Sequence, residues 1–181
     1  MTNLISGATN MWREKNDLNL RPMEKIQLKI NIQYSALEEL PADEQDLVKN
    51  AIKATDNSNA KYSHFRVGAA LLLGDGSVVI GANQENAVFP LGLCAERTAI
   101  FATQAQRPDQ PILKLAIAAR NEEGLMHNPV TPCGSCRQVI LEMEERYHQP
   151  IRILLYGLNG VYSVDTVRDL LPLSFVDESM R

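Results

Sequence analysis

The sequence lacks long hydrophobic runs and any excess of positive charge. No segment approaches the ~18 consecutive apolar residues of a membrane-spanning helix. Residues 1–22 lack the basic start and apolar block of a secretory signal, so we expect a cytoplasmic protein with no membrane partner. The 18 Lys and Arg residues are outnumbered by 22 Asp and Glu residues. Because nucleic-acid binding needs clustered cations, we expect no nucleic-acid partner and favour a small or neutral ligand.

Cysteine is also scarce, with only Cys94, Cys133 and Cys136 in the chain. An odd number of cysteines in a sequence that lacks an export signal argues against a disulfide framework. A single cysteine is most often an inert residue packed in the core. Cys133 and Cys136, however, stand three apart in TPCGSCRQ at a predicted helix start, where both sulfurs can reach one ion. A redox pair is the alternative, but such motifs normally follow the first strand of their fold.

Zinc is the metal that this set of thiols favours. Cys94 opens the preceding predicted helix and can supply a third sulfur, since a helix N-terminus stabilises the thiolate. Three protein ligands leave a position for water, whereas four make a closed structural site. His64, His127 and His148 stand at no ligand spacing from a cysteine, which favours the open site. A binding or scaffold protein with a structural zinc stays the alternative.

Charged residues accompany both cysteine motifs. Arg97 and Arg137 can hydrogen-bond the sulfurs and offset the net negative charge of three thiolates on Zn²⁺, or else be solvated surface residues. Glu96 lies in the first turn of a predicted helix, where acidic residues are common because of the helix dipole. On an ideal helix it points about 200° away from Cys94, so spacing alone does not direct it to the metal.

Periodicity predicts alternating helices and strands in residues 41–181, after a partly flexible arm of residues 1–40 that contains one strand. The turn Gly74–Ser77 between two apolar runs is typical of a β-hairpin. The predicted elements are a helix from Ala42, strands near 67–73 and 77–83, a helix from Cys94 to Gln106, a strand at 111–119, a helix at 133–148, strands at 151–156 and 161–164, and a short helix at 166–171. This order favours a sheet covered by helices on both faces.

Four segments together resemble the small homotetrameric, zinc-dependent cytidine deaminases. They are YSHFRVGAALL at 62–72, GANQENA at 81–87, CAERTA at 94–99 and PCGSCRQ at 132–138. The resemblance covers roughly residues 42–178. It implies a cytidine deaminase-like fold of the α/β class, a three-layer α-β-α sandwich with a mixed sheet of about five strands. It also implies hydrolytic deamination of cytidine and 2′-deoxycytidine to the uridines, with release of ammonia, in pyrimidine salvage.

The resemblance assigns the chemistry to four residues. In zinc deaminases three protein ligands hold Zn²⁺, whose hydroxide attacks C4 of cytosine while a glutamate transfers protons. Cys94, Cys133 and Cys136 are the implied ligands, and Glu96 is the implied proton shuttle. Water must lose a proton, ring N3 must gain one, and the amino group must leave as ammonia. One carboxylate can serve all three steps.

The resemblance also implies substrate contacts. Asn83 and Glu85 stand two apart at a predicted strand end, so their side chains point the same way, and in the family such a pair binds the ribose hydroxyls. The resemblance also implies that Phe65 and Val67 pack against the pyrimidine ring. The N–H of Ala95 and the carbonyl of Thr131 are the implied contacts to the base and to its amino group or the released ammonia. Phe175 is implied to reach into a neighbouring subunit's site.

Two positions depart from the family pattern. Phe89 stands where relatives commonly carry a tyrosine, so the hydroxyl that helps to hold the sugar's 5′ side is missing. A modified cytosine nucleoside such as blasticidin S is therefore an alternative substrate. Arg66 replaces the proline of some members, and we attach no functional change to it.

Overall fold

A mixed β-sheet forms the centre of the protein in the computed structural model, which describes residues 24–181. The strand order is β1, β7, β6, β4, β2, β3, with β5 paired to β4. The strands are β1 (Gln33–Ser35), β2 (Arg66–Leu73), β3 (Val78–Ala82), β4 (Ile112–Asn121), β5 (Gly124–Leu125), β6 (Arg152–Gly157) and β7 (Gly160–Val164). Strands β4 and β6 run parallel, whereas the other neighbours run antiparallel.

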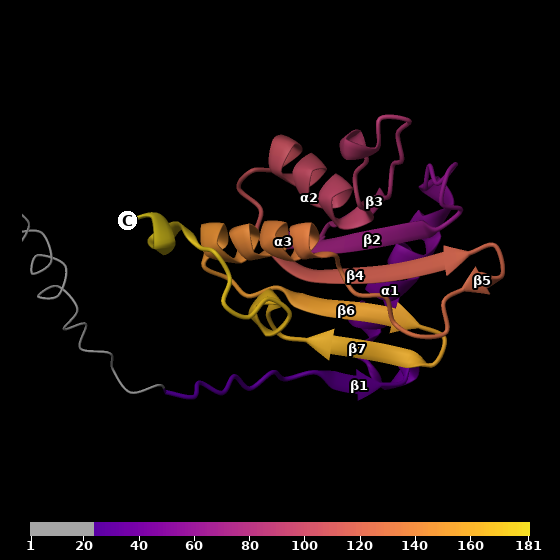
Figure 1. The fold of residues 1–181 in the computed structure, drawn as a ribbon. Helices are drawn as coiled ribbons and strands as arrows, with labels where there is room; N and C mark the ends of the chain where they lie inside the picture. The colour runs from indigo at the N-terminus through magenta and orange to yellow at the C-terminus, as the bar shows by residue number, and fades with distance from the viewer. Residues whose placement is uncertain (1–23) are drawn as a thin grey trace, which may run out of the picture.

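Three α-helices cover the two faces of this sheet (Figure 1). Helix α1 (Ala42–Ala54) packs on one face, and helices α2 (Ala95–Gln106) and α3 (Gly134–Tyr147) pack on the other. The predicted three-layer α/β fold is therefore confirmed. The sheet is wider than the five strands expected, because the short strands β1 and β5 are added to it.

The alternation of side chains along β4 builds both halves of the core. Leu115 and Ile117 face α2 and α3, whereas Ala116 and Ala118 face α1. The small residues on the α1 face let that helix approach the sheet closely. At Gly68 of β2 a Cβ atom would lie 2.1 Å from the carbonyl oxygen of Ala51 in α1, which requires glycine at this contact.

The arm contains one strand, as predicted, but this strand is short, and one predicted helix is shorter than expected. Polar and apolar residues alternate from Ile26 to Tyr34, but this segment pairs with the sheet only from Gln33. Gln33 lies opposite Ser163 of the antiparallel strand β7, and β7 ends at the next residue, Val164, so the residues before Gln33 have little strand left to pair with. The predicted helix at 166–171 is a single 3₁₀ turn at Val167–Asp169. Residues 1–23 of the predicted arm lie outside the described residues, and its division from residues 41–181 stays a proposal.

Several element ends meet at one end of the sheet. The register pairs Arg66 with Arg120 and Gly68 with Ala82, so β2 begins where β4 and β3 end. The N-termini of α2 and α3 are directed toward this end (Figure 1). Within residues 24–181 no helix combines the length and apolar character that a membrane crossing requires.

Candidate active site

Two helices begin at cysteines. Cys94 is the N-cap of α2 and Cys133 the N-cap of α3, both with extended backbone, and the buried Cys136 lies in the first turn of α3. The sulfur of Cys133 lies 3.8 Å from that of Cys94 and 3.5 Å from that of Cys136, and all three thiols are free. Sulfurs bound tetrahedrally at ~2.3 Å from Zn²⁺ stand roughly 3.8 Å apart, so the thiol group fits a zinc ion.

The thiol group is open rather than closed. Its three sulfurs lie within 4.8 Å of one another, and across residues 24–181 no histidine or carboxylate completes the set. His64 instead lies 3.7 Å from Glu122 at the surface. Three protein ligands leave a position for water, so this geometry favours a catalytic metal over the structural zinc that we considered as an alternative.

Positive charge beside the thiol group favours thiolates. Arg97 donates from Nη2 to the sulfur of Cys94 at 3.5 Å. Hydrogen bonding from Cys136, together with Arg97, lowers the pKa of Cys94 to about 5. The pKa of Cys136 is raised, first by its interaction with the neighbouring Cys94 sulfur and then by burial. Arg97 therefore lies where we expected it, as a partner of a ligand sulfur.

Arg137 does not contact a sulfur, contrary to our expectation. It donates to the carbonyl oxygens of Pro132 at 2.8 Å and Leu170 at 2.6 Å, and to the hydroxyl of Thr131 at 3.4 Å. Backbone carbonyls are stronger acceptors than a thiol. Pro132 and Thr131 lie on the loop that leads into Cys133, whereas Leu170 follows the 3₁₀ turn near the C-terminus. Arg137 therefore ties this loop to the C-terminal segment.

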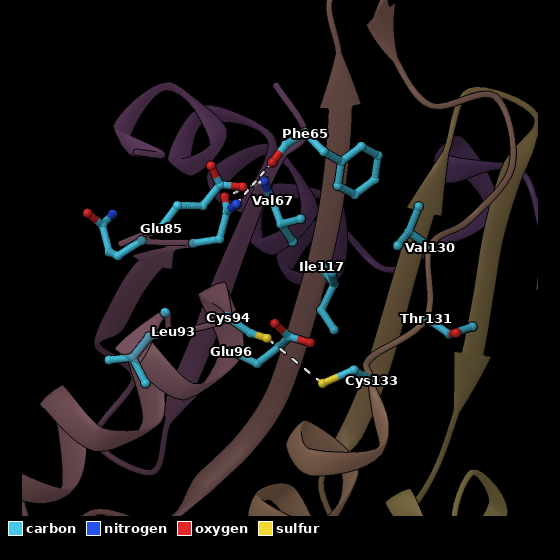
Figure 2. A pocket seen from close by; sticks show the side chains of 13 residues that line it. Phe65, Val67, Glu85, Leu93, Cys94, Glu96, Ile117, Val130, Thr131 and Cys133 are labelled. Atoms are coloured by element: carbon cyan, nitrogen blue, oxygen red, sulfur yellow. Dashed lines mark hydrogen bonds between the residues drawn. The ribbon is translucent and has the colours of Figure 1, made fainter. Parts of the chain in front are cut away.

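The carboxylate of Glu96 lies beside the sulfurs. Figure 2 shows it next to the line that joins Cys94 to Cys133. Helical spacing did not predict this direction, because Cys94 is an N-cap with ψ of 156° and lies outside the regular helix. The Glu96 residue is 4% exposed. Burial, and after it the nearby Cys94 charge, raises the pKa of this carboxyl group.

A cavity of about 320 Å³ opens above these groups. Figure 2 shows Cys94, Cys133 and Glu96 on one side of it, and Phe65, Val67 and Glu85 toward the other. The predicted residues that line it are Phe65, Val67, Asn83, Glu85, Cys94, Glu96, Thr131 and Cys133. The lining residues that we did not predict are Gln84, Gly92, Leu93, Ile117 and Val130. Gln84, Leu93 and Val130 each lie next to a predicted residue in the sequence. Ile117 does not, and it lines the cavity because β4 lies beside β2 in the sheet.

The amide of Asn83 holds the strand that carries the cavity's apolar wall. Its Oδ1 accepts from the N–H of Val67 at 2.8 Å, and its Nδ2 donates to the carbonyl of Phe65 at 2.9 Å. A primary amide has two N–H groups, so one donor remains for a ligand.

The carboxylate of Glu85 is held by a neighbouring turn. Its Oε2 accepts from the backbone N–H of Tyr62 at 2.7 Å and of Ser63 at 3.2 Å, and its Oε1 accepts from the Ser63 hydroxyl. The Ser63 hydroxyl bond, followed by the backbone bonds, lowers the pKa of Glu85. Glu85 therefore faces the cavity as an anion at neutral pH.

Three predicted contacts lie outside this cavity. Phe89 is 73% exposed and packs edge-on against Tyr62, with ring centroids 5.7 Å apart. Phe175 is 59% exposed, and its carbonyl accepts from Gln138 at 2.9 Å. Ala95 is buried at the first position of α2. In a single chain, Phe89 and Phe175 therefore do not line the cavity of that chain.

Residues 41–148 match the family model described as "Cytidine and deoxycytidylate deaminase zinc-binding region". The chain belongs to this deaminase family. The cytidine deaminase of Halalkalibacterium halodurans is 42% identical over 139 residues, which cover 76% of this chain and 98% of that protein. The cytidine deaminase of Sporosarcina psychrophila is 37% identical over 138 residues, covering 76% of this chain and 95% of that protein.

Solved structures of this family share the fold. The cytidine deaminase of Burkholderia pseudomallei is 37% identical with a TM-score of 0.62, covering 72% of this chain and 97% of that one. The cytidine deaminase of Mycobacterium tuberculosis is 33% identical with a TM-score of 0.58, covering 75% of this chain and 99% of that one. The predicted family and fold are confirmed, and the thiol group agrees with the zinc-binding description of the family model.

Proposed function

We propose that this chain catalyses the hydrolytic deamination of cytidine and 2′-deoxycytidine to uridine and 2′-deoxyuridine, with release of ammonia, in pyrimidine salvage. The buried carboxylate of Glu96 beside an open group of three thiols, facing a cavity of about 320 Å³, is the observation that carries this proposal. Relatives of 37% to 42% identity that are called cytidine deaminases support the substrate class.

The metal site assigns roles to four residues. Cys94, Cys133 and Cys136 would hold Zn²⁺, which when bound supplies a Lewis acid that lowers the pKa of water. Arg97 donates to the Cys94 sulfur, and its positive charge offsets part of the negative charge of the thiolates.

Glu96 is the residue that transfers protons. It takes a proton from water and gives it to ring N3, and it then takes the proton of the hydroxyl added at C4 and gives it to the amino group, which leaves as ammonia. A group that both accepts and returns a proton works best when its pKa lies near the working pH. The burial that raises the pKa of Glu96 therefore moves this carboxyl group in the favourable direction.

The cavity walls suit the two halves of a nucleoside. Phe65, Val67 and Ile117 supply apolar surface for the pyrimidine ring, while Asn83 and Glu85 offer polar groups to the sugar. Glu85 can accept from a hydroxyl, and the free N–H of Asn83 can donate to one. We retain the N–H of Ala95 and the carbonyl of Thr131 as contacts to the base.

We further propose a homotetramer with shared active sites, acting in the cytoplasm. Phe175 is exposed in the single chain and, in this proposal, reaches into a neighbouring subunit's site. The free thiols of all three cysteines suit a reducing compartment. Size-exclusion chromatography with light scattering should give four times the chain mass.

A nucleoside panel with a zinc measurement tests the activity. Purified protein should contain about one zinc per chain, and should convert cytidine and 2′-deoxycytidine with matched absorbance loss and ammonia release. Free cytosine should react far more slowly, because it lacks the sugar that Asn83 and Glu85 bind. Turnover of blasticidin S without turnover of cytidine would contradict the proposal and favour the modified-nucleoside alternative.

A further inference from the structure

Ser63 connects the sugar side and the base side of the cavity through one hydroxyl. This hydroxyl donates to Oε1 of Glu85 and accepts from the backbone N–H of Phe65 at 3.1 Å. A hydroxyl has one proton to donate, and an ionised carboxylate can only accept, so these two partners fix the direction of the O–H bond. Rotation of the O–H away from Oε1 would break the bond to Glu85.

The backbone of the same turn is shaped to hold Glu85. The N–H groups of Tyr62 and Ser63 both point at Oε2, at 2.7 Å and 3.2 Å. The turn is possible because His64 adopts a left-handed conformation with φ of 56°, and its N–H closes onto the carbonyl of Ala60 at 3.0 Å. Few non-glycine residues adopt such a conformation.

The network continues to the other member of the sugar pair. Phe65 is held at its N–H by Ser63 and at its carbonyl by Asn83. Asn83 is therefore bonded directly to the backbone of Phe65, and Glu85 is connected to it through the Ser63 hydroxyl. A change in the Ser63 hydroxyl alters the placement of Glu85 directly and that of Phe65 through its N–H.

We propose that Ser63 is a positioning residue for sugar recognition, whose hydroxyl fixes the Glu85 carboxylate in the direction of the nucleoside's sugar hydroxyls. The proposal rests on the proposed function, because it assumes that the cavity takes a nucleoside. Ser63 itself need not touch the substrate. It acts through Glu85, where it uses one acceptor position of Oε1 and leaves the other for a sugar hydroxyl.

The variants Ser63→Ala and Ser63→Thr test whether Ser63 positions Glu85 or only stabilises the fold. Kinetics are measured with cytidine and with 2′,3′-dideoxycytidine, the latter as a competitive inhibitor if its turnover is slow. A hydrogen bond to a charged group contributes about 1.5–3 kcal/mol, so Ser63→Ala should lower kcat/KM for cytidine about 10- to 100-fold, mainly through KM. The dideoxynucleoside lacks the hydroxyls that Glu85 binds, so its kcat/KM or inhibition constant should change less than about 2-fold.

Two further variants complete the design. Ser63→Thr keeps the hydroxyl and should recover most of the loss. Ser77→Ala is the matched control, because Ser77 also donates to a carboxylate, Asp75, but lies in the β2–β3 hairpin turn away from the cavity. An equal loss on both nucleosides, or no loss on cytidine, would overturn the positioning role.

A titration of Glu85 tests the same role without turnover. The Glu85 carboxyl pKa, followed by ¹³C chemical shift, should rise in Ser63→Ala, because the hydroxyl that stabilises the carboxylate is gone. An unchanged Glu85 pKa would contradict the proposal. If wild-type protein failed to deaminate cytidine, the proposed function would be wrong, yet this titration would still decide whether Ser63 controls Glu85.

Discussion

The sulfurs of Cys94 and Cys133 lie 3.8 Å apart although 39 residues separate them in the chain. Each is the N-cap of a different helix, and both helices pack on the same face of the sheet. The metal site is therefore a product of helix packing. Changes that shift either helix should alter zinc binding, whereas changes confined to the cavity's apolar wall should not.

Removal of one thiol should remove the metal. In Cys133→Ala only two sulfurs remain, so zinc content should fall from about one per chain to well below half, and cytidine turnover should be lost. Chelator treatment of wild-type protein should give the same inactivation, reversed by added Zn²⁺ but not by Mg²⁺, which prefers oxygen ligands. A Cys133→Ala protein with full zinc content would refute the assigned ligand set.

Glu96→Gln should separate proton transfer from metal binding. The amide has nearly the same shape but cannot take a proton, so kcat should fall at least about 10²- to 10⁴-fold while zinc content stays unchanged. Glu142→Gln provides a matched control, since Glu142 is an exposed residue of α3 and should tolerate the change. Near-normal kcat in Glu96→Gln would contradict the assigned role.

Strand β3 approaches helix α2 closely at Gly81. A Cβ atom there would lie 2.5 Å from the carbonyl oxygen of Ala95 and 2.6 Å from the nitrogen of Ala99. Gly81→Ala should therefore displace the helix that begins at Cys94, lowering the free energy of unfolding by about 1–3 kcal/mol or more. Zinc affinity, measured by competition with a chromogenic chelator, should fall in the same variant.

Gly134→Ala supplies the contrast for that experiment. Gly134 is the first residue of α3, and a Cβ atom there would meet nothing within 4 Å. Because alanine also favours the helix, the unfolding free energy should stay level or rise by up to about 1 kcal/mol. Equal destabilisation of both variants would show that the close contact at Gly81 does not determine the position of α2.

A buried carboxylate anchors the far end of α3. Oε1 of Glu144 accepts from the N–H groups of Ile151 and Val167, each at 2.9 Å, and Oε2 accepts from the Thr166 hydroxyl at 2.7 Å. Glu144→Ala leaves these donors without a partner, so unfolding in urea should show a loss of about 1–3 kcal/mol or more. Glu144→Gln keeps one oxygen acceptor and should lose less. An equal loss in both variants would argue against this account.

Local sequence patterns predicted most elements because their periods are strong. The apolar runs that predicted β2 and β4, and the amphipathic period that predicted α3, appear within two residues of the expected bounds, and α1 begins at the predicted Ala42. The extent of the weaker elements depends on neighbouring segments. The segment that starts at Ile26 forms a strand only at Gln33–Ser35, because its partner strand β7 ends at Val164. The sequence of residues 26–34 carries no information about the length of β7.

The sequence by itself determined the residue types of the site: three thiols, one first-turn glutamate and a polar pair at the end of a strand. The tertiary structure alone decided their directions. Glu96 turns toward the sulfurs because Cys94 caps the helix in an extended conformation, and Arg137 turns away from them because backbone carbonyls lie within reach. Side-chain direction depends on packing between segments distant in sequence, which local periodicity does not contain.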